Sequence, residues 1–300
     1  MLDLLPVPSP AAKVVADSIS PWGDRLTSVQ VVLHRFVLAE LNTHRVFSRN
    51  SASSRAIPVA KQLERFMNDP WYPMAWTSEQ PGMQGGTPLQ GVDLLEAQAL
   101  LELIHDFTGR VIGEYVESHP EDATRLHKSL LNRPMEWAQS HTVLITSTAW
   151  GGFYAQRVSP LAQPEFDAAA RAIKAAIEAS VPARLEWDQW HTPYIQPDET
   201  FESIRQQCEV SAARCARTSY LTQEGVRDVG EDLRLFHRLA TADPMHASPL
   251  EHIARPSTTN SAWVTIEDFE GAGVIGKVQV PLLGNFLGYR QFRHMVTGEF

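Results

Sequence analysis

A β-strand is predicted at Thr27-Ser28-Val29-Gln30-Val31-Val32-Leu33, where β-branched residues are concentrated. A helix is expected to begin shortly afterwards, at Phe36-Val37-Leu38-Ala39-Glu40-Leu41. Position 44 therefore falls at or just past the end of that helix. This strand and helix, joined by a short connection, predict a fold that mixes the two kinds of element.

Further elements are predicted on both sides of this unit. Strands rich in β-branched residues are expected at 12–20 and 141–148. A Gly- and Gln-rich stretch at 76–89 predicts a long loop, for which a lid is one interpretation. Apolar periodicity predicts helices at 59–67, 92–117, 123–132, 165–180, 202–215 and 228–242. The helix at 92–117 has a broad apolar stripe, which is typical of a core or an oligomer interface. The predicted fold class is α/β, of the α+β type.

Positive charge is concentrated in the thirteen residues from Thr43 to Arg55. This segment contains three Arg, one His, four Ser and one Asn, and no carboxylate, although the whole chain carries 35 Asp and Glu against 26 Lys and Arg. Arginine binds phosphate through two parallel hydrogen bonds, and serine hydroxyls add further donors to the same oxygens. The segment therefore predicts a phosphate-binding loop, with a solvated charged loop as the alternative.

The composition narrows the class of protein. A chain of 300 residues that is 43% apolar can bury a substantial core, and it lacks an apolar run long enough to span a bilayer. A net charge of -9 argues against binding a nucleic-acid polymer. Cys208 and Cys215 lie seven residues apart in a predicted helix and are expected to be core residues, and no metal-binding cluster is predicted. We expect a cytoplasmic protein that binds neither a membrane nor nucleic acid.

The charged segment resembles the signature of the flavin-dependent thymidylate synthases, the ThyX family. That signature reads Arg-His-Arg, seven residues, Ser, one residue, Arg, and it is matched here by His44, Arg45, Ser53 and Arg55, with Thr43 in place of the first Arg. The resemblance implies that the nucleotide is bound by Ser53, Ser54, Arg55, Arg133 and Arg157. It also implies that FAD is bound by His44, Arg45, Arg49, Asn50, Thr146 and His252.

A second segment also resembles this family. Phe153 and Arg157 are followed by Ala162-Gln163 and Glu165, as in the family's pattern of Phe-x-x-x-Arg and then Ala-Gln-x-Glu at the start of a helix. The resemblance implies that Arg157 is catalytic, because the family's Arg at this point stabilises negative charge that develops on the uracil. The alternative is a structural ion pair between Arg157 and Glu165.

The resemblance implies a fold, an activity and an assembly. The fold is a central mixed or antiparallel sheet flanked by helices, with long helices at an oligomer interface. The activity is reductive methylation of carbon 5 of dUMP, with FAD as cofactor and NADPH and methylenetetrahydrofolate as co-substrates. The assembly is a homotetramer with shared active sites. Residues 1–195 are expected to form the core that carries the motifs, and 196–300 a helical and strand extension packed into the same domain.

Two other functions stay open. A methylase acting on UMP in a modified-nucleoside pathway would keep the same motifs. A nucleotide-binding relative without catalysis is the other, and it is favoured by Thr43, by Ser51 in place of Glu, and by Gly152 in place of Asn.

Overall fold

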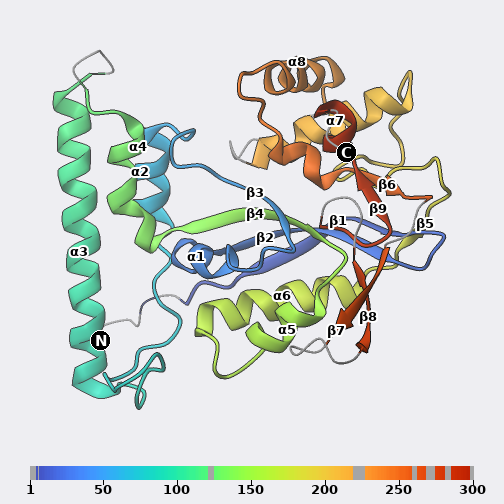
Figure 1. Ribbon diagram of the computed structural model, residues 1–300. Coiled ribbons are helices and arrows are strands. Elements are labelled where there is room, and N and C mark those ends of the chain that lie inside the picture. Colours follow the sequence, from blue (N-terminus) through green and yellow to red (C-terminus); the bar gives the residue numbers. More distant parts are fainter. Residues whose placement is uncertain are drawn as a thin grey trace.

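The fold is built on a five-stranded mixed sheet (Figure 1). The computed structural model describes residues 5, 7–120, 125–218, 227–258, 262–267, 274–280 and 285–297. The strand order is β3-β4-β2-β1-β5, in which only the β1–β5 pair is parallel. The strands are β1 (Ala11–Ile19), β2 (Arg25–His34), β3 (Ser48–Ser51), β4 (Ser140–Ser147) and β5 (Ala183–Arg184). The predicted α+β class is confirmed, and so are the strands expected at 12–20, 27–33 and 141–148.

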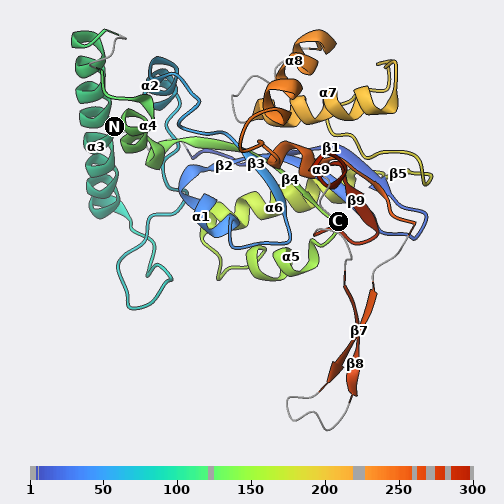
Figure 2. The same ribbon diagram turned by 45° about the horizontal axis from the view of Figure 1, so that its top comes forward.

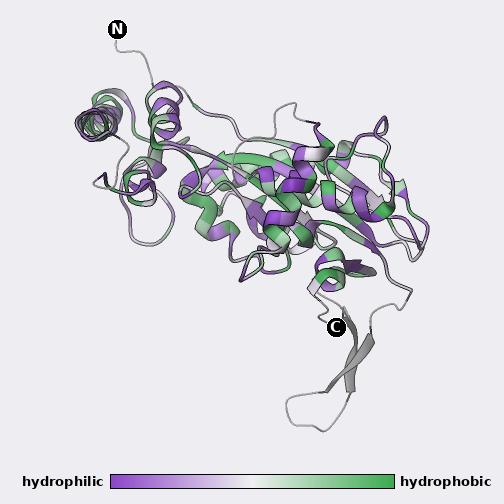
Figure 3. Cartoon of the chain, turned by 90° about the horizontal axis from the view of Figure 1, so that it is seen from above, coloured by the Kyte–Doolittle hydropathy of each residue, from purple (hydrophilic) through white to green (hydrophobic). Residues whose placement is uncertain are grey.

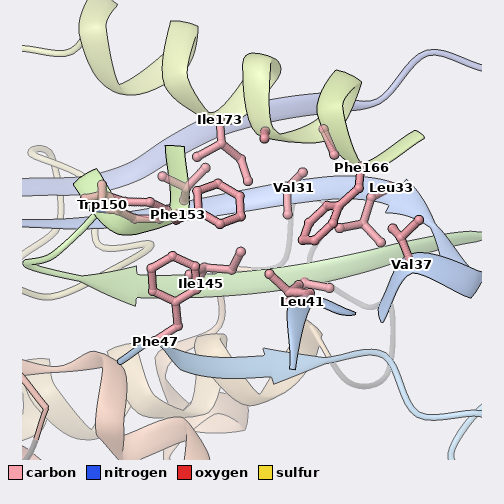
Figure 4. Packing of buried hydrophobic residues seen from close by; sticks show 14 of the residues in the cluster. Val31, Leu33, Val37, Leu41, Phe47, Ile145, Trp150, Phe153, Phe166 and Ile173 are labelled. Carbon is pink, nitrogen blue, oxygen red and sulfur yellow. The ribbon is translucent and has the colours of Figure 1, made fainter. Parts of the chain in front are cut away.

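One face of the sheet is covered by α5 (Gly151–Arg157) and α6 (Pro164–Ala179), which lie below the sheet in Figure 1. Figure 4 shows how Val31 and Ile145 of the sheet pack against Phe153, Phe166 and Ile173 of these helices. All five side chains are at most 2% exposed. Burial of an aromatic or branched apolar side chain contributes about 1.5–3 kcal/mol, so this cluster fixes the position of α5 relative to the sheet.

The opposite face of the sheet is covered by C-terminal elements. Because successive strand residues point to opposite faces, Leu144 packs on this side, against α7 (Ile204–Arg217) and α8 (Val229–Ala240). Cys208 and Cys215 belong to the same cluster, as expected, and burial raises the pKa of Cys208 to about 12. Around it lie η4 (Ser248–His252), β6 (Ala254–Pro256), β9 (Tyr289–Gln291) and α9 (Phe292–Thr297). In Figure 2, α7 and α8 lie above the sheet. β7 (Ala262–Glu267) pairs with β8 (Val274–Val280).

A third cluster lies at the end of the sheet. There α2 (Val59–Asn68) and η2 (Arg133–Ala138) pack against α3 (Gly91–Ser118), a helix that stands at the edge of the molecule and is seen end-on in Figure 3. His105, Gly109 and Ile112 are buried on the inner side of α3. The outer side carries exposed apolar residues spaced three and four apart, namely Leu100, Leu103, Phe107 and Val111, each at least 45% exposed. The predicted helix is confirmed, and it is apolar on two sides.

Two helix predictions need correction. The helix expected at 123–132 is only α4 (Lys128–Leu131), since the side chain of His127 accepts the Ser129 N–H and caps the helix there; positions 123 and 124 lie outside the described residues. Pro134 does not end it but lies in the 3-10 helix η2. The helices at 202–215 and 228–242 are present as α7 and α8, but they are not the last, because α9 follows. Among the described residues, no helix is long and apolar enough to cross a membrane.

Candidate functional site

Arg157, at the end of α5, is in direct contact with His44, which lies just before β3. The Arg157 Nε donates to His44 Nε2 at 3.0 Å, and its Nη1 donates to Glu40 Oε2 at 2.7 Å. The carboxylate partner of Arg157 is thus Glu40, whereas Glu165 accepts the Met74 N–H at 2.7 Å. The two resemblance segments, more than a hundred residues apart in the chain, are therefore brought into direct contact.

The helix before His44 and the aromatic rings of α5 and α6 hold His44 and Arg157 in place. His44 follows α1 (Leu38–Leu41), itself preceded by the 3-10 helix η1 (Arg35–Val37). The His44 ring lies 5.1 Å from the Phe153 ring, and the Arg157 guanidinium lies 4.7 Å from the centre of Phe166. Arg49 donates to the carbonyls of Leu41 and His44 at 3.0 and 3.1 Å and so satisfies the end of α1.

The electrostatics keep His44 neutral. Burial lowers the pKa of His44, and the nearby guanidiniums of Arg157 and Arg49 lower it further. A neutral imidazole can accept the Arg157 N–H on its Nε2, as the geometry requires. His44 therefore orients Arg157 without adding a second positive charge.

A cavity of about 880 Å³ opens beside Arg157. Its walls include Glu40, Glu165, Met83, Gln84 and Leu161. The expected loop at 76–89 forms one side: it is closed by the Thr77–Pro88 bridge and fastened by Gln84 Nε2, which donates to the Leu161 carbonyl at 2.7 Å. Nη2 of Arg157 has no hydrogen-bond partner among the described residues, so the guanidinium keeps one donor edge for a ligand.

The loop predicted to bind phosphate lies outside this cavity. Arg55 is exposed, and the loop backbone is held by Asn132, whose side chain donates to the carbonyls of Ser54 and Ile57 at 2.7 and 3.0 Å. Lys128 Nζ donates to the Ala56 carbonyl at 3.3 Å. Next to this loop, a cavity of about 340 Å³ is lined by Arg125, His127, Lys128 and the start of α2. Ser53, Ser54 and Arg55 thus have basic neighbours that sequence reasoning did not assign to the site.

The two parts of the segment 43–55 lie on either side of β3. Ser48 pairs with Thr146, and the Ala52 N–H bonds to the Thr142 carbonyl, so the chain between His44 and Arg55 runs along four residues of β4, about 13 Å. Ser53, Ser54 and Arg55 do not line the cavity beside Arg157.

Four of the residues expected to bind FAD are occupied inside the fold. The side chain of Arg49 donates to backbone carbonyls, as described above, and Asn50 donates to the Cys215 carbonyl at 2.6 Å. Thr146 and His252 are 0% exposed, and Thr146 Oγ1 lies 2.8 Å from His252 Nδ1. Of the other two members of the set, Arg45 is exposed and His44 is half-buried, as Arg49 is.

A buried polar chain crosses the sheet from Thr146. Thr146 Oγ1 lies 2.5 Å from Ser28 Oγ, which lies 2.8 Å from His191 Nε2, and His191 Nδ1 lies 2.9 Å from Ser18 Oγ. Every member is at most 5% exposed. His191 is therefore a buried, hydrogen-bonded residue, and Thr146 and His252 belong to the same chain.

Arg133 lines neither the cavity beside Arg157 nor the one beside Lys128. It is exposed, its Nε donates to the Ser129 carbonyl at 3.2 Å, and it lines a shallow hollow of about 460 Å³ with Arg35 and Trp137. Sequence reasoning missed Glu40, although its position four residues before His44 at a helix end could have indicated that the two side chains are neighbours. Among the described residues, no group of His, Cys, Asp and Glu is arranged to bind a metal.

Comparison with known proteins gives no family. No family model matches the chain, and no curated protein matches it.

Proposed function

We propose that the protein methylates carbon 5 of the uracil of dUMP, as the resemblance to the ThyX family implies. The observation that carries the proposal is Arg157, held by His44 and Glu40 at the wall of a ligand-sized cavity. Pockets of 300–1,000 Å³ with a few convergent polar groups are typical binding sites for small molecules.

Arg157 would act on the uracil ring. Methylation requires carbon 5 to become nucleophilic, and the ring edge then carries negative charge. A guanidinium fixed beside that edge interacts more strongly with the charged transition state than with the resting nucleotide, which raises turnover. Neutral His44 holds the guanidinium plane, and Nη2 remains to donate to the ligand.

The nucleotide phosphate would be bound by a second copy of the chain. Ser53, Ser54, Arg55 and the neighbouring Lys128 supply donors and positive charge for it. Because Ser53, Ser54 and Arg55 do not line the cavity beside Arg157 in one copy, we expect a complete site to need two copies. The exposed apolar side of α3 is a surface through which copies can associate, in the homotetramer that the resemblance implies.

FAD fits the chain only in part. His44 and Arg45 are placed to contact it, whereas Arg49, Asn50, Thr146 and His252 are engaged inside the protein. When bound, FAD supplies the hydride that reduces the transferred methylene group, with NADPH and methylenetetrahydrofolate as co-substrates. The chain's own contribution is to orient the nucleotide and to stabilise charge on its ring.

A nucleotide-binding protein without catalysis is the second candidate. The engagement of four expected flavin ligands inside the fold favours it. Such a protein would bind a nucleotide through the phosphate loop and the Arg157 cavity but would not catalyse its methylation.

The test begins with the purified protein. A flavin absorption band, followed by release of tritium from carbon 5 of labelled dUMP, is the expected result when folate and NADPH are added. Labelled UMP, assayed in parallel, distinguishes the two methylases. Nucleotide binding with neither flavin absorption nor tritium release, even after FAD is supplied, would leave only the second candidate.

A further inference from the structure

The cavity beside Arg157 has an unusual balance of charge for a nucleotide site. Two carboxylates, Glu40 and Glu165, face one guanidinium, and that guanidinium already pairs with Glu40. Phosphates are bound by surplus positive charge and by N–H donors, and neither is in surplus here. The cavity is therefore suited to a ligand that brings hydrogen-bond donors.

Glu165 is the best-placed acceptor. It is 2% exposed, it begins the buried side of α6, and one of its oxygens accepts the Met74 N–H at 2.7 Å. A carboxylate has about four acceptor positions, so this bond leaves most of its capacity unused. Burial makes that capacity valuable, because hydrogen bonds to a charged group in a dry site are about twice as strong as neutral ones.

The remaining walls suit a flat, largely apolar body. Phe36, Pro73, Met83 and Leu161 contribute apolar surface, and the amides of Gln84 and Gln163 add polar groups at the rim. The loop that carries Gln84 is fastened to Leu161 and so covers one side. A planar heterocycle can lie between these walls with one edge directed at Glu165.

We propose that this cavity binds a pterin, with the carboxylate of Glu165 accepting two hydrogen bonds from its 2-amino-4-oxopyrimidine edge. That edge presents an amino group and a ring N–H side by side, which matches the two oxygens of a carboxylate. Within the proposed function, on which this assignment rests, the pterin is the head group of the reduced folate. Glu165 and the loop at 76–89 then recognise the methylene donor, and Arg157 faces the uracil.

Two small ligands test the assignment directly. Pterin and lumazine have the same bicyclic ring, but lumazine has an oxygen in place of the 2-amino group. Fluorescence titration of the wild-type protein, without FAD or nucleotide, is expected to show pterin binding at least about tenfold tighter than lumazine, as expected for one charge-assisted hydrogen bond. Equal affinities, or no binding of pterin, would overturn the proposal.

Glu165→Gln isolates the carboxylate. The amide oxygen of Gln can still accept the Met74 N–H, so the fold is retained while the charge and one acceptor are lost. The preference for pterin over lumazine should disappear in this variant and persist in Glu178→Gln, which removes an exposed carboxylate from the other end of the same helix. A preference that persists in a folded Glu165→Gln protein would contradict the assignment.

A second variant covers the case in which Glu165→Gln does not fold. Leu161 is 74% exposed at the cavity wall, so Leu161→Trp adds bulk there without disturbing the core. It should weaken pterin binding, and unchanged affinity would place the pterin elsewhere. Binding of dUMP, measured in parallel, separates the two proposals: loss of dUMP binding or turnover with the pterin preference intact would refute only the proposed function.

Discussion

The two ends of the segment 43–55, which flank β3, are in different physical states. At the His44 end the side chains are partly buried, packed on aromatic rings and hydrogen-bonded to one another. At the Arg55 end the backbone is fixed by Asn132 and Lys128, while the guanidinium of Arg55 is exposed. The first end holds its functional group rigidly, and the second holds only the loop that presents it.

This difference predicts different effects on rate and on affinity. A preorganised donor in a partly dry site contributes most when charge develops during the reaction. An exposed arginine contributes mainly to binding a group that is already charged. We therefore expect changes at the His44 end to affect turnover, and changes at the Arg55 end to affect nucleotide affinity.

The largest effect is expected for Arg157→Ala. Removing a fixed donor from an active site lowers turnover about a hundredfold to a thousandfold. Single-turnover methylation measures this loss, and calorimetry measures dUMP affinity separately. Arg157→Lys should not restore the rate, because an ammonium lacks the planar fork that His44 and Glu40 orient. A loss below tenfold, or one expressed wholly in affinity, would make Arg157 a structural or phosphate-binding residue.

Arg55→Ala should act on affinity. Loss of a charge-assisted bond to phosphate costs about 1.5–3 kcal/mol, or roughly 10- to 150-fold in the dissociation constant of dUMP. FAD affinity should change much less, because Arg55 follows β3 whereas His44 and Arg45 precede it. Deoxyuridine, which lacks the phosphate, is the matched control ligand and should bind both proteins equally. Equal loss of dUMP and FAD would show that the signature is not divided between two ends.

Mixed assemblies test whether the two ends work in different copies. Subunits with Arg157→Ala and subunits with Arg55→Ala, once exchanged, should form some sites that retain both residues. Activity should rise at least about tenfold above the mean of the two unmixed variants, since intact sites form only in mixed oligomers. Mixing Arg157→Ala with His44→Ala, which alter the same end, should give no recovery. Absence of recovery in both mixtures, with subunit exchange verified by mass, would place the whole site within one copy.

Phe107→Glu should disrupt the assembly in which the His44 end of one copy meets the Arg55 end of another. Phe107 is 56% exposed on the outer side of α3, and burying a carboxylate in an apolar contact would raise the dissociation constant about tenfold or more. Light scattering across a range of protein concentrations checks this. Val181→Glu places the same charge on an 89% exposed residue elsewhere and should leave the mass unchanged. A monomeric Phe107→Glu protein with full activity would show that one copy is sufficient.

The smallest expected effect is a change of the unfolding free energy with pH, caused by three buried histidines. Burial lowers the pKa of His191 and of His252 to about 3, and it lowers that of His141 to about 3 together with Arg35 and Arg65. The unfolded chain takes up protons at these positions near pH 6.5 and the folded chain does not, so stability is present above pH 6.5 and is lost as the pH falls towards 3. Each histidine should cost about 1.4 kcal/mol of unfolding free energy between pH 7.5 and 5.5.

Urea unfolding at several pH values measures this loss. His191→Asn should make the pH dependence shallower, whereas His237→Asn, which alters an exposed position, should leave it unchanged. A pH dependence that is the same in both variants would mean that His191 is protonated in the folded protein.

Local pattern was sufficient for much of the fold. The strand at 27–33 and the helix at 92–117 follow from residue types and periodicity within short windows. The short length of α4, before Pro134, does not follow from such local patterns, because it depends on a side-chain cap from His127.

For the site, the motif placed His44 and Arg157 among the functional candidates, and the structure brings them together. The pairing of Arg157 with Glu40 and the separation of Arg55 from Arg157 could not be predicted. The first depends on the packing of α1 beside α5, and the second on the path of the chain along β3, and both are set by contacts distant in sequence.

The polar chain through the sheet has a direction as well as a position. Each hydroxyl in this chain has one proton and each neutral imidazole has one N–H, so the direction of one hydrogen bond sets the direction of the others. If Ser18 donates to His191 Nδ1, then His191 carries its proton on Nε2, Ser28 donates to Thr146, and Thr146 donates to His252 Nδ1. His252 is then the Nε2–H tautomer, and its Nε2 has no hydrogen-bond partner among the described residues. A serine on β1 is thereby linked to the tautomer of a histidine in η4, across β2 and β4.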